Sequence, residues 1–296
     1  MNLRILGYFV TVAHEKNITR AADILHITQP TLSRQLMQLE EELGVKLFER
    51  GQNKFALTSA GNLLLARAKD IMELIEKTES DLRDQETNLS GNIVIGVGEI
   101  EAVEVLSDIL KAFHQLHADV SFDILTGTSD VIKDKMEKGI IDIALFLEPI
   151  DMQDYEYIEL PNQEVFGVLM RKDAPLSKKE SISASDLANF PLLLPSRLTV
   201  RSSILNWLSG SIANINIIGT CNLHGNARVL VDHMYCYAIT VGSKYFGDEH
   251  FAFRPLNPAI TSKVYLARRR GVRFSVTLQK FYEFAKCFLS MKREKI

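Results

Sequence analysis

The segment that most constrains the fold is residues 18–44, ITRAADILHITQPTLSRQLMQLEEELG, which predicts two amphipathic helices separated by a short turn. The first helix places the small residues Ala21 and Ala22 on its apolar face, so another helix can approach closely. Thr28 is a favourable N-cap for the second helix. Pro30 fits its first turn, because the N–H that proline lacks would have no intrahelical acceptor there. The pattern predicts a helix-turn-helix.

The face predicted at the start of the second helix carries uncharged polar side chains and one arginine. Leu32, Leu36 and Leu39 recur every three or four residues and mark the buried side of this helix. The opposite side bears Gln, Thr, Ser and Arg, which hydrogen bond to base edges and phosphates, and a helix N-terminus favours an anion. Three glutamates, residues 40–42, lie at the far end, which would point away from phosphate. This asymmetry predicts a recognition helix in the major groove of DNA, and a plain helical hairpin with a polar face is the alternative.

A short hairpin is predicted directly after this helix, within VKLFERGQNKFALTSAG. Arg50, Asn53 and Lys54 lie in the hairpin. A basic hairpin beside a recognition helix is typical of a wing that lies along the DNA backbone or in the adjacent minor groove. Thr58 begins the next helix, and we expect it to cap that helix while donating a hydrogen bond to a phosphate.

Residues 62–89 contain neither proline nor glycine and predict one long helix. Positions 64, 68, 71, 75, 78 and 82 recur in alternating steps of four and three, and all except Thr78 are apolar. This gives a heptad-like stripe with charged residues around it. Such a stripe is typical of a helix that pairs with a second copy, and the alternative is a helix packed on its own domain.

From Gly91 onward, short apolar segments alternate with amphipathic ones. Residues 92–147 read as strand, helix, strand, helix and strand, and a similar run starts near residue 163. This alternation predicts a parallel, doubly wound sheet in each run, and hence two α/β subdomains with a crevice between them. In open α/β sheets, ligands lie beyond the carboxyl ends of the strands.

Composition narrows the function classes. The chain has 34 basic and 37 acidic residues, and residues 1–61 have a net charge of only +1, so DNA specificity is expected to require a dimer on two half-sites. The three cysteines lack CxxC spacing, which argues against a disulfide scaffold or zinc site and suits a reducing cytosol. A redox-sensing pair, Cys221 with Cys236, remains an alternative. No apolar run approaches the roughly 20 residues of a membrane span, so a cytoplasmic protein without membrane contact is expected.

An enzyme would need a catalytic constellation that the sequence does not offer. The seven histidines are scattered without HExxH spacing, GVGEIE does not match the phosphate-binding GxGxxG pattern, and no P-loop is present. We therefore expect neither catalysis nor a cofactor or metal.

The sequence resembles the LysR-type transcriptional regulators over its whole length. The stretches that match are FVTVAHEKNITRAADILHITQPTLSRQLMQLEEELGVKLFER, ALTSAG, GIIDIALF and DLANFPLLLPSR. The resemblance implies a multidomain α+β architecture: a winged helix-turn-helix (1–61), a linker and dimerisation helix (62–90) and an effector-binding domain (91–296) similar to periplasmic binding proteins. In that domain, subdomain I would cover about 91–161 and 267–296, and subdomain II about 162–266. The crossing strands would lie near 161–165 and 262–266.

The family also implies partners and site residues. The partners are promoter DNA, a small-molecule effector of unknown identity and further copies in a homodimer or homotetramer, with RNA polymerase as an additional candidate. The implied DNA-contacting residues are Thr28, Gln29, Pro30, Thr31, Ser33, Arg34, Arg50, Asn53, Lys54 and Thr58. The implied effector-binding residues are Gly98, Glu99, Ile100, Glu101, Thr126, Gly127, Thr128, Phe146, Leu147, Ser196, Arg197 and Arg201.

The class of effector stays open at this point. Strand ends and two arginines would favour a carboxylate or phosphate, but Glu99 and Glu101 would oppose an anion. The expected mechanism is closure of the two subdomains on the ligand, which changes the angle between paired linker helices and the half-sites contacted. The alternatives are a redox-responsive or ligand-independent DNA-binding regulator, and a solute-binding protein without a DNA role.

Overall fold

The computed structural model describes residues 2–51, 54–83, 89–209, 215–242 and 249–293. The chain divides into two compact units, Met1–Ser80 and Asp81–Ile296. Within the described ranges, no helix is both long enough and apolar enough to cross a membrane.

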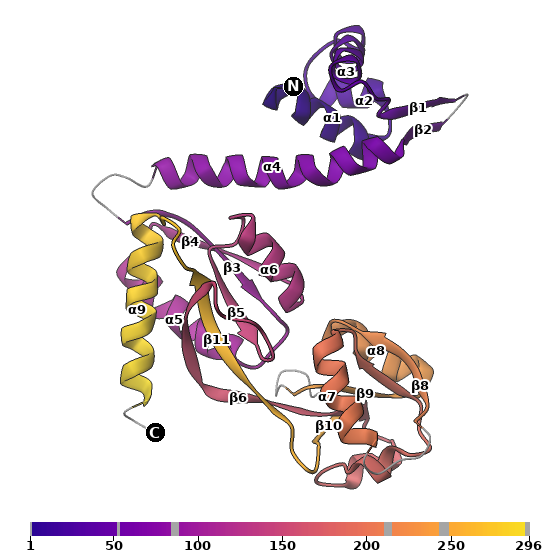
Figure 1. Ribbon diagram of the computed structural model, residues 1–296, viewed down its shortest axis with the longest axis vertical. Coiled ribbons are helices and arrows are strands. Elements are labelled where there is room, and N and C mark those ends of the chain that lie inside the picture. The colour runs from indigo at the N-terminus through magenta and orange to yellow at the C-terminus, as the bar shows by residue number, and fades with distance from the viewer. Residues whose placement is uncertain (1, 52–53, 84–88, 210–214, 243–248, 294–296) are drawn as a thin grey trace. The chain divides into compact units, whose positions relative to one another are not determined.

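The first unit begins with three helices, α1 (Leu3–Glu15), α2 (Ile18–Ile24) and α3 (Gln29–Leu43). A hairpin of β1 (Phe48–Gly51) and β2 (Lys54–Leu57) follows, and then the long helix α4 (Ser59–Arg83) (Figure 1). Ala21 and Ala22 are the buried residues of α2, and they pack with Leu32, Leu36 and Leu39 in one apolar core. The predicted helix-turn-helix is therefore confirmed, with Gly44 ending α3 in a left-handed conformation (φ 69°).

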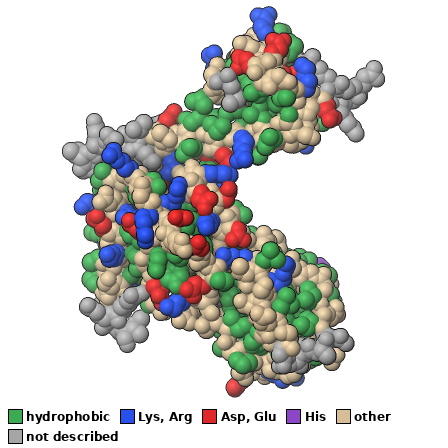
Figure 2. All heavy atoms as spheres, in the orientation of Figure 1, with side chains coloured by type: hydrophobic (Ala, Val, Ile, Leu, Met, Phe, Trp, Pro, Cys, Tyr) green, Lys and Arg blue, Asp and Glu red, His purple; other side chains and the backbone are tan. Residues whose placement is uncertain are grey.

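Helix α4 starts three residues before the predicted linker, because Ser59–Gly61 form its first turn. Gly61 is required there, since a Cβ atom would lie 2.2 Å from the Leu47 carbonyl oxygen. Leu64 and Leu65 pack on the core of the first unit, so this end of the stripe covers its own domain. Farther along, Figure 2 shows hydrophobic side chains on the surface of the helix, and Leu74 is exposed.

The second unit is built on one sheet of nine described strands: β3 (Gly91–Val97), β4 (Val120–Thr126), β5 (Ile143–Leu147), β6 (Tyr155–Arg171), β7 (Leu192–Pro195), β8 (Ile217–Cys221), β9 (Tyr237–Val241), β10 (Phe251–Pro255) and β11 (Thr261–Arg269). The strand order is β4-β3-β5-β11-β6-β9-β7-β8, and β10 pairs with β6. The helices are α5 (Val103–Leu116), α6 (Ser129–Glu137), α7 (Leu198–Ser209), α8 (His224–Met234) and α9 (Val276–Arg293), with short 3-10 turns at Pro175–Lys178 and Ala184–Leu187.

Two lobes share this sheet (Figure 1). Lobe 1 contains β3, β4, β5, α5, α6 and α9, and its core includes the edge-to-face pair of Phe113 and Phe281, whose ring centroids are 5.1 Å apart. Lobe 2 contains β7, β8, β9, β10, α7 and α8, with a second core and a smaller apolar cluster on which α8 packs. Strands β6 and β11 run through both lobes and pair with each other from Thr261↔Val165 to Arg269↔Tyr155, with a register shift between Lys263 and Tyr265.

The sheet is mixed: the predicted parallel pairing holds within each lobe, but not for the strand that begins the second predicted run, β6, or for β10 and β11. Strands β3, β4 and β5 are parallel to one another, as are β7, β8 and β9, but β6, β10 and β11 pair antiparallel with their neighbours. The reason is the long β6, which leaves lobe 1 and enters lobe 2, so that β11 must return in the opposite direction beside it.

Candidate functional site

The start of α3 presents a polar surface, here called the recognition surface and defined by Thr28, Gln29, Pro30, Thr31, Ser33 and Arg34. All are exposed except Ser33, which is half-buried. The Gln29 amide donates to the Ser33 hydroxyl at 2.8 Å, and the hydroxyls of Thr28 and Thr31 lie 2.8 Å apart. These two pairs of side chains thus hydrogen bond to one another at the surface of the first unit.

Thr28 occupies the N-cap position of α3, with φ −77° and ψ 145°, but its side chain makes no capping hydrogen bond. The predicted cap is therefore wrong in its chemistry, because the hydroxyl is directed to that of Thr31 instead. Proline lies in the first turn as predicted. The amides at this end of the helix thus lack a side-chain cap, as an anion-binding terminus would.

Glu40 does not belong to the exposed acidic end that was predicted for α3. It is only 4% exposed, and its carboxylate accepts hydrogen bonds from the amides of Leu47 (2.9 Å) and Phe48 (3.3 Å) and from Lys46 Nζ (2.7 Å). Burial alone would raise the pKa of Glu40, but these hydrogen bonds and the charge of Lys46 bring that pKa below its usual value. The residue anchors the hairpin on α3, and only Glu41 and Glu42 of the three glutamates are exposed.

The hairpin holds the backbone of Arg50 in β1 and of Lys54 in β2, while Asn53 lies outside the described residues. Thr58 caps α4 as expected, since its hydroxyl accepts from the Gly61 amide at 3.0 Å. The predicted donation from Thr58 to phosphate stays a prediction. Its one hydroxyl proton is directed to the Lys46 carbonyl oxygen at 2.6 Å.

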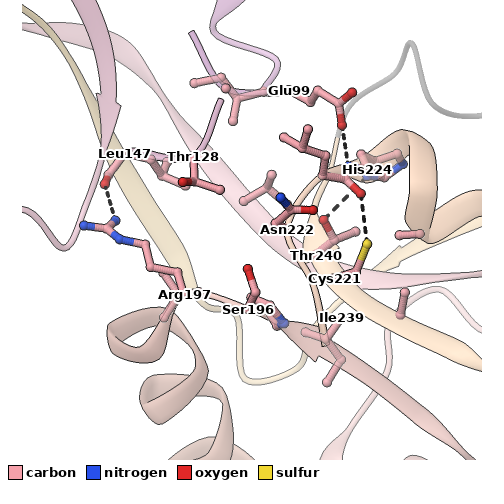
Figure 3. Close-up of a pocket in the computed structure, with 18 of the residues that line it drawn as sticks. Glu99, Thr128, Leu147, Ser196, Arg197, Cys221, Asn222, His224, Ile239 and Thr240 are labelled. Atoms are coloured by element: carbon pink, nitrogen blue, oxygen red, sulfur yellow. Dashed lines mark hydrogen bonds between the residues drawn. The ribbon is translucent and has the colours of Figure 1, made fainter. Parts of the chain in front are cut away.

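The second unit contains a cavity between its lobes, here called the interlobe cavity (Figure 3). It encloses about 890 Å³, part of which is open to solvent. Its concave and mostly apolar lining suits a small-molecule site. Eight of the predicted effector residues line it: Gly98, Glu99, Ile100, Gly127, Thr128, Leu147, Ser196 and Arg197. They come from the ends of β3, β4 and β5 in lobe 1 and from the β7–α7 junction in lobe 2.

Two predicted lobe 1 residues at strand ends do not line the interlobe cavity. Phe146 is completely buried and packs edge-on against Tyr155, with the ring centroids 5.4 Å apart. Neighbouring residues on a strand face opposite sides, so Leu147 faces the cavity and Phe146 does not. Thr126 ends β4, the strand at the border of the sheet, and is exposed to solvent away from the cavity.

Glu101 and Arg201 are also outside the cavity lining. The amide of Glu101 donates to the Glu164 carboxylate at 3.2 Å and that of Ala102 at 2.8 Å, which fixes this turn against β6. Burial raises the pKa of Glu164. Arg201 lies one turn beyond Arg197 on α7, where it no longer reaches the cavity.

Most residues that sequence reasoning missed are apolar or come from lobe 2. They are Ser129, Leu145, Phe166, Leu193, Leu194, Pro195, Val200, Cys221, Asn222, Leu223, His224, Ala227, Ala238, Ile239, Thr240 and Val241. Some of these residues could have been predicted from the rule that the carboxyl ends of strands line the crevice. Cys221 ends β8, and Thr240 lies near the end of β9.

Glu99 reaches across the interlobe cavity to the N-terminus of α8. Its carboxylate accepts a short hydrogen bond from the His224 amide and a second one, at 3.1 Å, from the Gly225 amide. Leu223, the N-cap residue of α8, makes no side-chain capping bond, so Glu99 provides the acceptor that this helix end lacks.

Arg197 makes the reverse connection, from lobe 2 to lobe 1. Its Nη1 donates to the Leu147 carbonyl oxygen at 3.2 Å, and its Nε lies 3.4 Å from the Asp130 carboxylate. Figure 3 shows the Glu99 and Arg197 contacts at separate edges of the cavity.

His224 and Cys236 are buried on the lobe 2 side. Burial, together with the charge of Arg228, lowers the pKa of His224 to about 4, so its imidazole is neutral at pH 7. Burial raises the pKa of the Cys236 thiol, which disfavours the reactive thiolate. The Cys221 thiol donates to the Leu223 carbonyl oxygen at 3.2 Å, and the three cysteines are unpaired thiols. No cluster of metal-ligating side chains occurs among the residues described.

Comparison with known proteins gives matches in both units. Residues 3–62 match the model of the bacterial regulatory helix-turn-helix protein, lysR family, and residues 86–289 match that of the LysR substrate binding domain. The HTH-type transcriptional regulators YtlI and BsdA of Bacillus subtilis (strain 168) are 31% and 30% identical, over 72% and 78% of this chain and 69% and 79% of theirs. The crystal structure of CbnR complexed with its target DNA has a TM-score of 0.74 at 21% identity, covering 97% of this chain and 100% of that one.

Proposed function

Because the chain belongs to the LysR family of bacterial transcriptional regulators, we propose that its recognition surface binds the major groove of promoter DNA and that a small molecule in the interlobe cavity controls the outcome. The chain is a DNA-binding transcriptional regulator with an effector-binding domain. We further propose that it acts in the cytoplasm, where promoter DNA and RNA polymerase are its partners.

One observation carries the DNA-contact proposal: the polar groups at the start of α3 are exposed and bond to each other, so they can exchange these partners for base edges and phosphates. Arg34 is exposed on the same end of the helix and supplies the charge. A protein of similar fold, CbnR, has been crystallised with its target DNA, which supports this use of the fold.

The proposed dimer forms through α4. Its exposed Leu63 and Leu74 and the half-buried Ile71 and Ile75 provide apolar surface along a 25-residue helix. Because Leu64 already packs on its own domain, the pairing would use the later part of the predicted stripe. Two copies would then present two recognition surfaces to two half-sites, as the small charge of one domain requires.

The effector proposal rests on the interlobe cavity, which both lobes line. A ligand that contacts both lobes stabilises their closed arrangement, and this closure would be transmitted to the paired α4 helices and the half-sites contacted. The redox alternative has less support, because the buried Cys236 has a raised pKa.

The test is a DNase footprint on the DNA upstream of the chain's own gene, followed by binding titrations on the protected site. Arg34→Ala should weaken specific binding by about 1–3 kcal/mol if the guanidinium reads a base edge. Arg273→Ala, at an exposed position in the second unit, is the matched control and should leave affinity unchanged. Equal affinity of Arg34→Ala and the unmodified chain would contradict the assignment of Arg34.

A further inference from the structure

The two charged side chains that line the interlobe cavity both contact the opposite lobe. Glu99, after β3 in lobe 1, holds the amides of His224 and Gly225 in lobe 2. Arg197, before α7 in lobe 2, contacts the Leu147 carbonyl oxygen and the Asp130 carboxylate in lobe 1. Among the described lining residues, Glu99 is the only acidic one and Arg197 is the only lysine or arginine.

At the α8 end of the cavity, the groups that would normally hold an anionic ligand are occupied by the chain itself. Free amides at a helix N-terminus attract anions, but at α8 the Glu99 carboxylate already accepts from two of them. An incoming carboxylate would have to displace these charge-assisted hydrogen bonds and lie close to a second negative charge. Arg197 lies at a separate edge of the cavity, where its Nη1 donates to the Leu147 carbonyl oxygen and its Nε lies 3.4 Å from the Asp130 carboxylate, so it does not neutralise the charge of Glu99.

The remaining wall of the cavity suits an uncharged molecule. Leucine, valine, isoleucine, phenylalanine and alanine side chains form most of it, from β5, β6, β7 and β9. Uncharged hydrogen-bonding groups are placed at its edges by Thr128, Ser196, Asn222 and Thr240 (Figure 3). A ligand carboxylate against such a wall would lose its hydration without gaining a charged partner.

Building on the proposed regulator function, we propose that the interlobe cavity binds an uncharged, largely apolar ligand with one or two hydrogen-bonding groups, and that Glu99 is the specificity-determining residue that excludes carboxylates. The carboxylate of Glu99 occupies the position at the α8 amides that the carboxylate of a ligand would otherwise take. A neutral ligand leaves both interlobe contacts in place and fills the apolar space beside them.

The test compares uncharged amides with carboxylates of the same shape, by calorimetric titration of the full chain. The pairs are phenylacetamide and phenylacetate, hexanamide and hexanoate, and cyclohexanecarboxamide and cyclohexanecarboxylate. In the unmodified chain, the amide of the pair that binds best should bind at least about tenfold more tightly than its carboxylate, which corresponds to about 1.4 kcal/mol.

Removing the carboxylate should reverse this preference. In Glu99→Ala, which exposes the α8 amides, the affinity for the carboxylate should rise at least about tenfold while that for the amide changes less than about threefold. Asp119→Ala removes an exposed carboxylate from the same lobe and should change neither affinity. Glu99→Gln keeps the shape and an acceptor, so it decides the matter if Glu99→Ala does not fold: its two affinities should fall within about threefold of each other.

Three results would overturn the proposal: a carboxylate that binds the unmodified chain as tightly as its amide, no gain of carboxylate affinity in either Glu99 variant, or no binding of any of the six compounds. DNA binding by the same preparations is measured separately. A chain that ranks the compounds as expected but leaves no footprint would contradict the proposed function and not the ligand class.

Discussion

At the start of α3 the polar side chains face solvent and bond to one another, whereas in the interlobe cavity the charged side chains bond to the opposite lobe. The first arrangement leaves a surface ready to exchange its partners for those of DNA. The second leaves a space in which Glu99 and Arg197 already contact the opposite lobe, so we expect shape and apolar area to decide what enters. We therefore expect exposed polar groups to determine what the recognition surface binds. In the interlobe cavity, we expect the contacts of Glu99 and Arg197 with the opposite lobe to determine which ligands are excluded.

The largest expected effect tests which side of β5 belongs to the interlobe cavity. Phe146→Ala should destabilise the second unit by about 3–5 kcal/mol, because it empties a completely buried site beside Tyr155. Ligand affinity should stay within about threefold of the unmodified chain at temperatures where the variant is folded. Denaturant unfolding and the calorimetric titration measure the two quantities.

Leu147→Ala is the matched comparison, since Leu147 is the next residue on the strand and lines the cavity. It should cost less stability and change ligand affinity more. If Phe146→Ala binds ligand poorly while keeping its stability, the aromatic ring lies in the binding site. The assignment of Phe146 and Leu147 to opposite faces of β5 would then be wrong.

A somewhat smaller effect is expected where the C-terminal part of α3 meets the hairpin. Glu40→Ala should destabilise the first unit by about 3 kcal/mol, because it leaves the buried amides of Leu47 and Phe48 without their acceptor. Operator affinity should fall as well, since the hairpin is no longer anchored on α3. Denaturant unfolding with a footprint titration checks both. Glu41→Ala, at an exposed neighbour, should change stability by less than about 0.5 kcal/mol, and equal effects of the two variants would contradict a structural role for Glu40.

How much could be predicted from sequence differs between the two sites for a physical reason. The recognition surface follows from helical periodicity, because Leu32 and Leu36 fix the buried side and so determine which way Arg34 faces. Glu40 was misread because its partners, the amides of Leu47 and Phe48, become neighbours only when the hairpin folds back. Local pattern identifies the face of a helix, but it does not show which polar residue on that face a later segment will cover.

The cavity was predicted at the right strand ends but not at the right side chains. Successive residues of β5 face opposite sides of the sheet, so only one of Phe146 and Leu147 can line the cavity. The sequence does not show which one, because β5 is a short apolar run in which all residues but the last are buried. The contact between Glu99 and α8 joins residues 125 positions apart, and no local pattern indicates it. From the sequence, the negative charge of Glu99 indicates only that an anionic ligand would be repelled. The structure shows in addition that the Glu99 carboxylate accepts hydrogen bonds from the α8 amides that an anion could otherwise use.

The smallest expected effect concerns pH and the lobe 2 side of the interlobe cavity. Burial lowers the pKa of His224 to about 4, against 6.5 for an unperturbed histidine. Between these two pH values the unfolded chain binds a proton at this residue and the folded chain does not. The contribution of His224 to stability is therefore fully present above pH 6.5 and is lost as the pH falls towards 4. Allowing for solvent screening, we expect a loss of about 2 kcal/mol.

The measurement is denaturant unfolding of the unmodified chain and of His224→Gln between pH 4.5 and pH 7, taken as a difference so that other titrating groups cancel. Gln does not titrate in this range, so the stability of the unmodified chain should fall relative to the variant as the pH decreases. His233→Gln, at an exposed position on the same helix, should give a nearly parallel profile to the unmodified chain. If the His224 and His233 variants behave alike, the imidazole of His224 is reached by water. The lobe 2 wall of the cavity would then be more polar than its lining suggests, and the preference for an uncharged ligand would lose part of its physical basis.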